Sequence, residues 1–135
     1  MIVVGYLATR EGRQGVTSAL EEAIRRKIAV TVVVSEKSAK QAPEALTQRD
    51  EDLARIQAEA QDSGVALDVR IMSERHDVAE DLIAVAEETS AELIVIGLRR
   101  RSPVGKLILG SNAQRILLDS PCPVLAVKTE RSATH

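Results

Sequence analysis

The chain has 135 residues, of which 44% are hydrophobic and 1% are aromatic, and its 18 basic and 20 acidic residues leave a net charge of −2. This length fits one domain with its own core. Because the chain has a single aromatic residue, Tyr6, and no excess of positive charge, it lacks the stacking platforms and basic field that nucleic acids require. We therefore expect no nucleic-acid partner.

The sequence indicates a cytoplasmic protein. No apolar run reaches the length of a membrane span, and the opening MIVVGYLATREG lacks the basic region and cleavage site of a signal peptide. The lone Cys122 cannot form an internal disulfide, which agrees with a reducing compartment. We therefore expect no membrane association.

Apolar runs of strand length alternate with longer segments of helical period. The first run, IVVGYL at 2–7, is followed by apolar residues at helical spacing between Val16 and Ile24. The second run, AVTVVV at 29–34, is almost wholly apolar and β-branched, as in a strand covered on both faces. We expect this second strand to be central in a sheet.

The middle of the chain contains a second helical pattern and an alternating strand. The apolar face of the predicted helix is formed by Leu46, Leu53, Ile56 and Ala60, and the helix ends near Gly64. In the segment VALDVRIM at 65–72, apolar residues 65, 67, 69 and 71 form one row and the charged residues 68 and 70 form the other. Such alternation predicts an edge strand with one face partly exposed.

The last third of the chain repeats the same order. Residues 78–89 have a helical period, and ELIVIG at 92–97 predicts a fourth strand. A short helix is marked by Ala113, Ile116 and Leu117, and VLAVK at 124–128 predicts the last strand. The polar tail at 129–135 is predicted to be disordered.

Strands alternating with helices predict an α/β fold. We expect a five-stranded parallel open sheet with strand order 3-2-1-4-5, helices on both faces, and a single domain over residues 1–128. In such a sheet, ligands bind outside the carboxyl ends of the strands, where the direction of winding reverses. Gly97 and the residues after Tyr6 then face the same crevice.

The loop GLRRRSPVGKLILGSN at 97–112 is the main candidate for ligand binding. It is not a Walker A loop, because seven residues separate its first glycine from its GK pair and no Ser or Thr follows that pair. Its last three residues, Gly110, Ser111 and Asn112, open a helix whose first amides lack intrahelical partners and could receive an anion. The alternative is an ordinary helix cap without a ligand.

The spacing in this loop resembles the universal stress protein (UspA-like) family. Nucleotide-binding members of that family carry GxxG, nine residues, and then Gly with Ser or Thr, and this chain has GLRR at 97–100, nine residues, and then Gly110 and Ser111. VVGY near the start and SPCPVLAVK after the last helix extend the resemblance over essentially the whole chain. The resemblance implies a UspA-type fold, similar to that of the adenine nucleotide alpha hydrolases. It also implies a stress-response protein that binds ATP, with or without Mg²⁺.

The resemblance also implies site residues. It places adenine, sugar and phosphates beside six positions: Val34, Ile96, Gly97, Gly110, Ser111 and Asn112. Thr9 is a further candidate from the first loop.

Two positions depart from the family pattern. Arg100 replaces the second glycine, and Leu7 stands where an acidic residue that contacts adenosine usually falls. Arg100 could bind phosphate through its guanidinium group or could fill the site. The run at 99–101, which includes Arg99, could bind an anion close to the helix start or could be a solvated loop.

Other polar residues suggest no second chemistry. The acidic run 50–52 is interpreted as a solvated helix face, and His76 and His135 do not predict a metal pair. Cys122 is interpreted as an inert, partly buried thiol. No nucleophile, base and orienting group can be assembled, so we predict at most slow ATP hydrolysis.

Three functions remain open. The leading hypothesis is a stress-response protein that binds an adenine nucleotide. The second is a dimeric interaction module in which Leu7 and Arg100 have replaced the nucleotide contacts, and the third is a weak nucleotide hydrolase. The downstream partner cannot be identified from the sequence.

The last predicted strand suggests an assembly. It is short, apolar and terminal, so it would form an exposed edge of the sheet. Members of the resembled family commonly pair this edge across a two-fold axis. We therefore expect a homodimer formed through Val124, Leu125, Ala126 and Val127. The alternative is a monomer in which this edge is covered.

Overall fold

A computed structural model describes residues 1–7, 9–35, 43–72, 77–98 and 110–128. The elements follow in the order β1 (Ile2–Tyr6), α1 (Arg10–Arg26), β2 (Val30–Ser35), α2 (Pro43–Asp62), β3 (Leu67–Met72), α3 (Val78–Glu88), β4 (Leu93–Leu98), α4 (Ser111–Asp119) and β5 (Val124–Lys128). Each element expected from the apolar runs and helical patterns is present, with ends shifted by a few residues. The predicted disordered tail lies outside the described residues.

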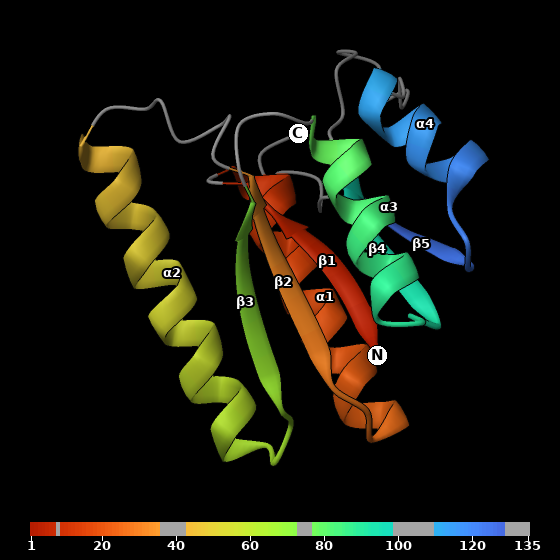
Figure 1. The fold of residues 1–135 in the computed structure, drawn as a ribbon. Coiled ribbons are helices and arrows are strands. Elements are labelled where there is room, and N and C mark those ends of the chain that lie inside the picture. The colour runs from red at the N-terminus through yellow and green to blue at the C-terminus, as the bar shows by residue number, and fades with distance from the viewer. Residues whose placement is uncertain (8, 36–42, 73–76, 99–109, 129–135) are drawn as a thin grey trace, which may run out of the picture.

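The described strands form one parallel five-stranded sheet in the order β3-β2-β1-β4-β5, as expected (Figure 1). β1 pairs with β2 on one side and with β4 on the other, so that Val3 stands opposite both Thr31 and Ile94. The chain progresses outward from β1 to β3 in one direction and then from β4 to β5 in the other. The winding therefore reverses between β1 and β4.

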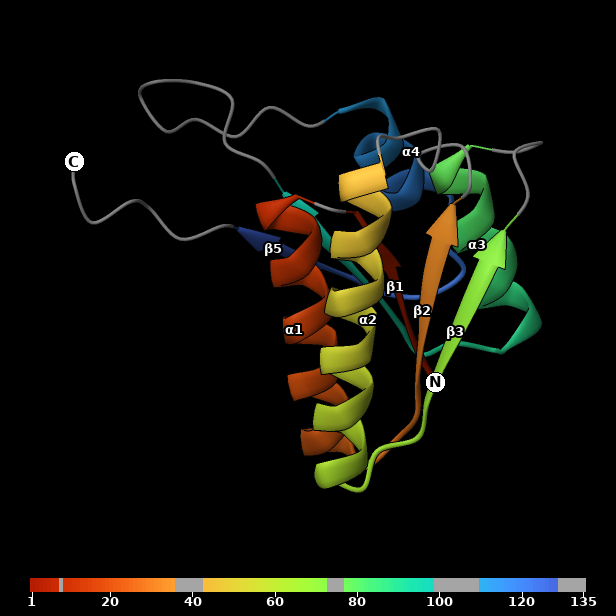
Figure 2. The same cartoon turned by 90° about the vertical axis from the view of Figure 1, so that its left-hand side faces the viewer.

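Helices cover both faces of the sheet. Figure 2 shows α1 and α2 on one face and α3 and α4 on the other. Successive side chains of β2 point to opposite faces of the sheet. Val32 and Val34 belong to the core under α1 and α2, and Val33 belongs to the core under α3 and α4. This two-sided burial explains why the β2 sequence is almost wholly apolar and lacks the alternation of a half-exposed strand.

One expectation about an apolar row was wrong. Ile71 was expected to share the covered row of β3, but it is 53% exposed because α2 diverges from β3 toward the carboxyl end of the strand (Figure 1). On α4, Leu117 and Leu118 are both exposed, Leu118 at 83%. Ile116 is the buried residue of that short helix.

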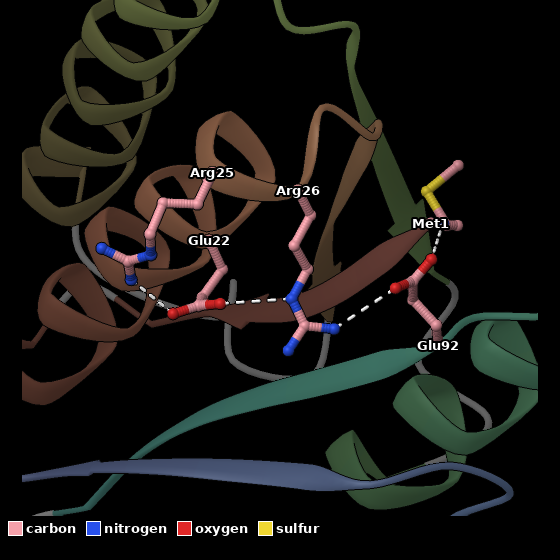
Figure 3. A network of polar contacts seen from close by, with 5 residues as sticks. All are labelled: Met1, Glu22, Arg25, Arg26 and Glu92. Carbon is pink, nitrogen blue, oxygen red and sulfur yellow. Dashed lines mark hydrogen bonds and ion pairs between the residues drawn. The ribbon is translucent and has the colours of Figure 1, made fainter.

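At the amino edge of the sheet, ion pairs connect α1 to the start of β4 (Figure 3). Arg26 forms hydrogen bonds of 3.2 Å with both Glu22 and Glu92, and Arg25 also pairs with Glu22. The amino group of Met1 lies 3.9 Å from Glu92. Arg25, Arg26 and Glu92 are exposed, so each of these ion pairs adds little stability.

The longest described helix, α2, has 20 residues and repeatedly carries charged side chains. Within the described ranges, no helix combines the length and apolar character needed to cross a membrane.

Candidate functional site

An open cleft of about 150 Å³ lies at the carboxyl ends of β1 and β4, where the winding of the sheet reverses. Its lining is Gly5, Leu7, Gly12, Val78, Leu82, Val95, Ile96, Gly97, Asn112, Ala113 and Ile116. β1 and β4 supply the floor, the first turns of α3 and α4 supply walls, and α1 closes a third side. This is where open parallel sheets bind ligands.

Close backbone packing brings α1 to this edge. A Cβ atom added at Gly97 would lie 2.0 Å from the backbone oxygen of Glu11, and one added at Gly12 would lie 2.3 Å from the backbone oxygen of Leu7. Both distances are far below van der Waals contact, so side chains at these positions would push α1 away from β1 and β4. The glycine at 97 is therefore required by packing, whether or not a ligand is bound.

Among the described residues that line the cleft, Asn112 has the one polar side chain. An enclosed apolar cavity of about this volume holds a molecule the size of benzene. Because this cleft is open, one ring of a larger flat base could lie in it, and its described lining has no carboxylate to face Mg²⁺. Elsewhere in the described ranges, no three His, Cys, Asp or Glu side chains gather as a metal site.

The first turn of α4 adjoins the cleft and has no side-chain cap. Gly110 is the N-cap residue, in an extended conformation with φ −70° and ψ 167°, and as a glycine it provides no side-chain oxygen to cap the first amides. By contrast, Thr9 caps α1 by accepting a hydrogen bond of 3.1 Å from the amide of Gly12, and Asp77 caps α3. The amides at the start of α4 are thus available to an anion.

The structure brings together only part of the predicted site. Leu7, Ile96, Gly97 and Asn112 line the cleft, and Gly110 and Ser111 immediately precede Asn112 at the start of α4. Two other predicted residues are placed elsewhere. Val34 is buried in the core on the opposite face of the sheet, and the Thr9 hydroxyl is engaged in capping α1. Arg99 and Arg100 lie outside the described residues.

Sequence reasoning missed seven cleft residues: Gly5, Gly12, Val78, Leu82, Val95, Ala113 and Ile116. A signal for two of them was present, because Val78 and Leu82 are four residues apart and therefore share one face of α3. That spacing predicts a common face but does not reveal that the face borders a cleft.

A buried polar cluster lies on the other face of the sheet. The acidic run 50–52 was expected to be solvated, and Asp50 and Glu51 are exposed, but Asp52 is only 4% exposed. Asp52 accepts a 2.6 Å hydrogen bond from the Tyr6 hydroxyl and a 2.9 Å bond from Gln48. The prediction for Asp52 was wrong because it considered the charge run without the helical period, which places Asp52 in line with the buried residues Ile56 and Ala60.

The charges around Asp52 explain how its carboxylate is tolerated in the core. Burial alone would raise the pKa of Asp52, but hydrogen bonds from Tyr6 and Gln48 and the positive charges of Arg13 and Arg55 hold it below its usual value. Burial, followed by the hydrogen bond to Asp52, raises the pKa of Tyr6. The two groups therefore remain a neutral donor and a charged acceptor at neutral pH.

Comparison with known proteins identifies the family. The sequence model of the universal stress protein family matches residues 1–128. A universal stress protein of Mycolicibacterium smegmatis is 44% identical over 128 residues, which cover 95% of this chain and 97% of that protein.

Solved structures agree with this match. A universal stress protein from Archaeoglobus fulgidus is 31% identical, with a TM-score of 0.73, and the match covers 94% of this chain and 97% of that chain. A second structure from that organism, a universal stress protein in complex with dAMP, is 25% identical with a TM-score of 0.67, and covers 94% and 96% of the two chains. Sequence and structure together establish that this chain belongs to the universal stress protein family.

Proposed function

We propose that this protein binds an adenine nucleotide in the cleft between β1 and β4. The observation that carries the proposal is that an apolar, ring-sized cleft and an uncapped helix start occur side by side. The base would occupy the cleft, and the phosphates would extend toward the amides of Ser111 and Asn112. The relative from Archaeoglobus fulgidus that is in complex with dAMP supports the choice of an adenine nucleotide.

ATP is the specific ligand that we propose from the family motif at 97–111. The described cleft offers no carboxylate to Mg²⁺, so any Mg²⁺ that accompanies ATP would be held by phosphate oxygens and water. The role of the chain's own residues is to bind and orient the nucleotide. Sustained release of phosphate would instead favour the hydrolase alternative.

The proposal is tested by titrating nucleotide-stripped protein with Mg·ATP and with dAMP in a calorimeter, in parallel with Gly110→Asp and Gly110→Asn. Asp and Asn have the same shape, and both are favourable N-caps in the extended conformation of Gly110. Only Asp places a negative charge beside the phosphates. We expect saturable binding by the wild type, weaker binding by Gly110→Asn, and no binding by Gly110→Asp.

A non-nucleotide interaction module is the competing function. It predicts no heat of binding from the wild type with either nucleotide. Equal binding by Gly110→Asp and Gly110→Asn would remove the start of α4 from the site without excluding the cleft.

We also propose a homodimer formed through β5. This strand is an edge of the described sheet, and Leu125 and Ala126 are exposed on it. A two-fold axis beside β5 would pair this edge with its copy and satisfy its unpaired backbone groups. A cytoplasmic location likewise remains a proposal.

A further inference from the structure

The helix α4 forms one wall of the cleft, yet apolar packing holds it weakly. Its nine residues include one buried side chain, that of Ile116, while Ala113 is half-buried and both Leu117 and Leu118 are exposed. A helix anchored by so little buried area needs other contacts to keep a fixed position.

Arg115 supplies such contacts. One of its terminal nitrogens lies 3.1 Å from Asp77 Oδ2 and 3.0 Å from Glu80 Oε1, so a single guanidinium group connects α4 to two carboxylates in the first turn of α3. Its Nε lies 3.8 Å from Asp119 within α4. α3 and α4 lie side by side in both views of the fold (Figures 1 and 2).

One acceptor of Arg115, the carboxylate of Asp77, is itself held in place. Asp77 is the N-cap of α3, and its Oδ1 accepts a 2.8 Å hydrogen bond from the amide of Glu80. Asp77 thus uses one carboxylate oxygen to cap α3 and the other to hold α4. The next residue, Val78, and Leu82 one turn further on both line the cleft.

We propose that Arg115 is a positioning residue that clamps α4 against α3 and thereby sets the width of the cleft and the position of the α4 amides. Asn112, Ala113 and Ile116 face the cleft from the same helix that Arg115 holds from outside. Loss of the clamp would let α4 move as a unit, because Ile116 is the one buried side chain that anchors this helix. The effect on ligand binding rests on the proposed function, but the clamp itself does not.

Hydrogen exchange of the ligand-free full chain tests the clamp. In Arg115→Gln, we expect the amides of 111–119 to exchange about fivefold faster, since the contacts that hold α4 against α3 are lost. The matched control is Arg25→Gln, which breaks an exposed ion pair with Glu22 (Figure 3). Arg25 lies in the last turn of α1, whereas Gly12, in the first turn, borders the cleft. This control should leave exchange in α4 unchanged.

Exchanging the charges of Arg115 and Glu80 shows whether the effect depends on the contact between α4 and α3 or arises within α4 alone. Arg115→Glu should increase exchange further, and adding Glu80→Arg should restore part of the protection, because the opposite charges again face each other across α3 and α4. A role confined to the Arg115–Asp119 pair would not respond to a change in α3. Unchanged exchange in Arg115→Gln, or no recovery in the double variant, would overturn the clamp.

Titration with dAMP then tests the link to the cleft. We expect Arg115→Gln to bind dAMP about fivefold more weakly than the wild type and Arg25→Gln to bind equally well. Faster α4 exchange with unchanged dAMP affinity would overturn the claim that the clamp shapes the site. Failure of the wild type to bind dAMP or Mg·ATP would remove the proposed function, while hydrogen exchange would still decide whether Arg115 holds α4.

Discussion

The hydroxyl of Tyr6 donates a 2.6 Å hydrogen bond to the buried carboxylate of Asp52, joining β1 to α2 across 46 positions of sequence. Tyr6 is the last residue of β1, and Leu7, the next residue, lines the cleft on the other face of the sheet. The bond therefore fixes the carboxyl end of β1 at the point where it borders the candidate site.

Removing the phenol hydroxyl should destabilise the fold. In Tyr6→Phe, the buried Asp52 loses a hydrogen-bond donor, and we expect the free energy of unfolding to fall by about 1–3 kcal/mol. Urea denaturation at neutral pH measures the change. Asp50→Asn, which alters an exposed carboxylate in the same helix, is the control and should change stability by less than about 0.5 kcal/mol. A Tyr6→Phe variant as stable as the wild type would show that this bond contributes nothing.

The same carboxylate should make stability depend on pH. The pKa of Asp52 is held below its usual 3.8 in the folded state, so its stabilising contribution is complete above that value and is lost as the pH falls through the folded-state pKa. We therefore expect the difference in unfolding free energy between wild type and Asp52→Asn to be constant between about pH 7 and 5 and to shrink in stronger acid. Denaturation curves across this range give the difference directly. If the difference in unfolding free energy between the two proteins grew as the pH fell, Asp52 would not be a stabilising carboxylate in the folded state.

Gly97 should tolerate no side chain. The Cβ of Gly97→Ala would lie 2.0 Å from the backbone oxygen of Glu11, and relief requires α1 to move, at a cost of about 1–3 kcal/mol or more. In the control variant Gly5→Ala, the added carbon would lie 3.2 Å from Cδ1 of Leu82, a flexible side-chain end, so a smaller loss is expected. Thermal unfolding of the two variants compares them. If Gly97→Ala were as stable as Gly5→Ala, the backbones of α1 and β4 would not be in close contact at Gly97.

The edge strand β5 should mediate dimer formation. Leu125→Lys places a charge on an exposed position of this edge, and we expect it to convert a dimer to a monomer. Light scattering coupled to size-exclusion chromatography gives the mass of each form. Leu118→Lys, which changes an exposed leucine on α4 instead of on β5, is the control and should leave the dimer intact. A wild type that is monomeric at all concentrations would refute the proposed homodimer.

The architecture could be predicted because it depends on patterns within short segments. The continuous run of β2 indicates burial on both faces, and the alternation of β3 indicates an edge, and the structure confirms both. These patterns could not predict whether each helix stays packed against its neighbouring strand along the whole length of that strand. Ile71 is exposed because α2 diverges from β3, a property of helix packing that no single segment contains.

The candidate site was predicted only in part for a similar reason. The loop motif pointed to Gly97 and to the start of α4, and both border the cleft. The apolar residues that give the cleft its shape come from several elements, and each of them looks like ordinary core in the sequence. The pairing of Tyr6 with Asp52 was equally hidden, since it joins an apolar run to a charge run 46 residues away.

The most direct test of nucleotide binding at this edge is an amide NMR titration of the stripped protein with dAMP. We predict saturable shifts at Gly5, Gly12, Gly97 and Asn112, which line the cleft. Ser63 and Gly64, which line a separate open groove of about 640 Å³ at the amino edge of the sheet, should not shift. Shifts confined to that groove, or no shifts at saturating dAMP, would contradict binding between β1 and β4.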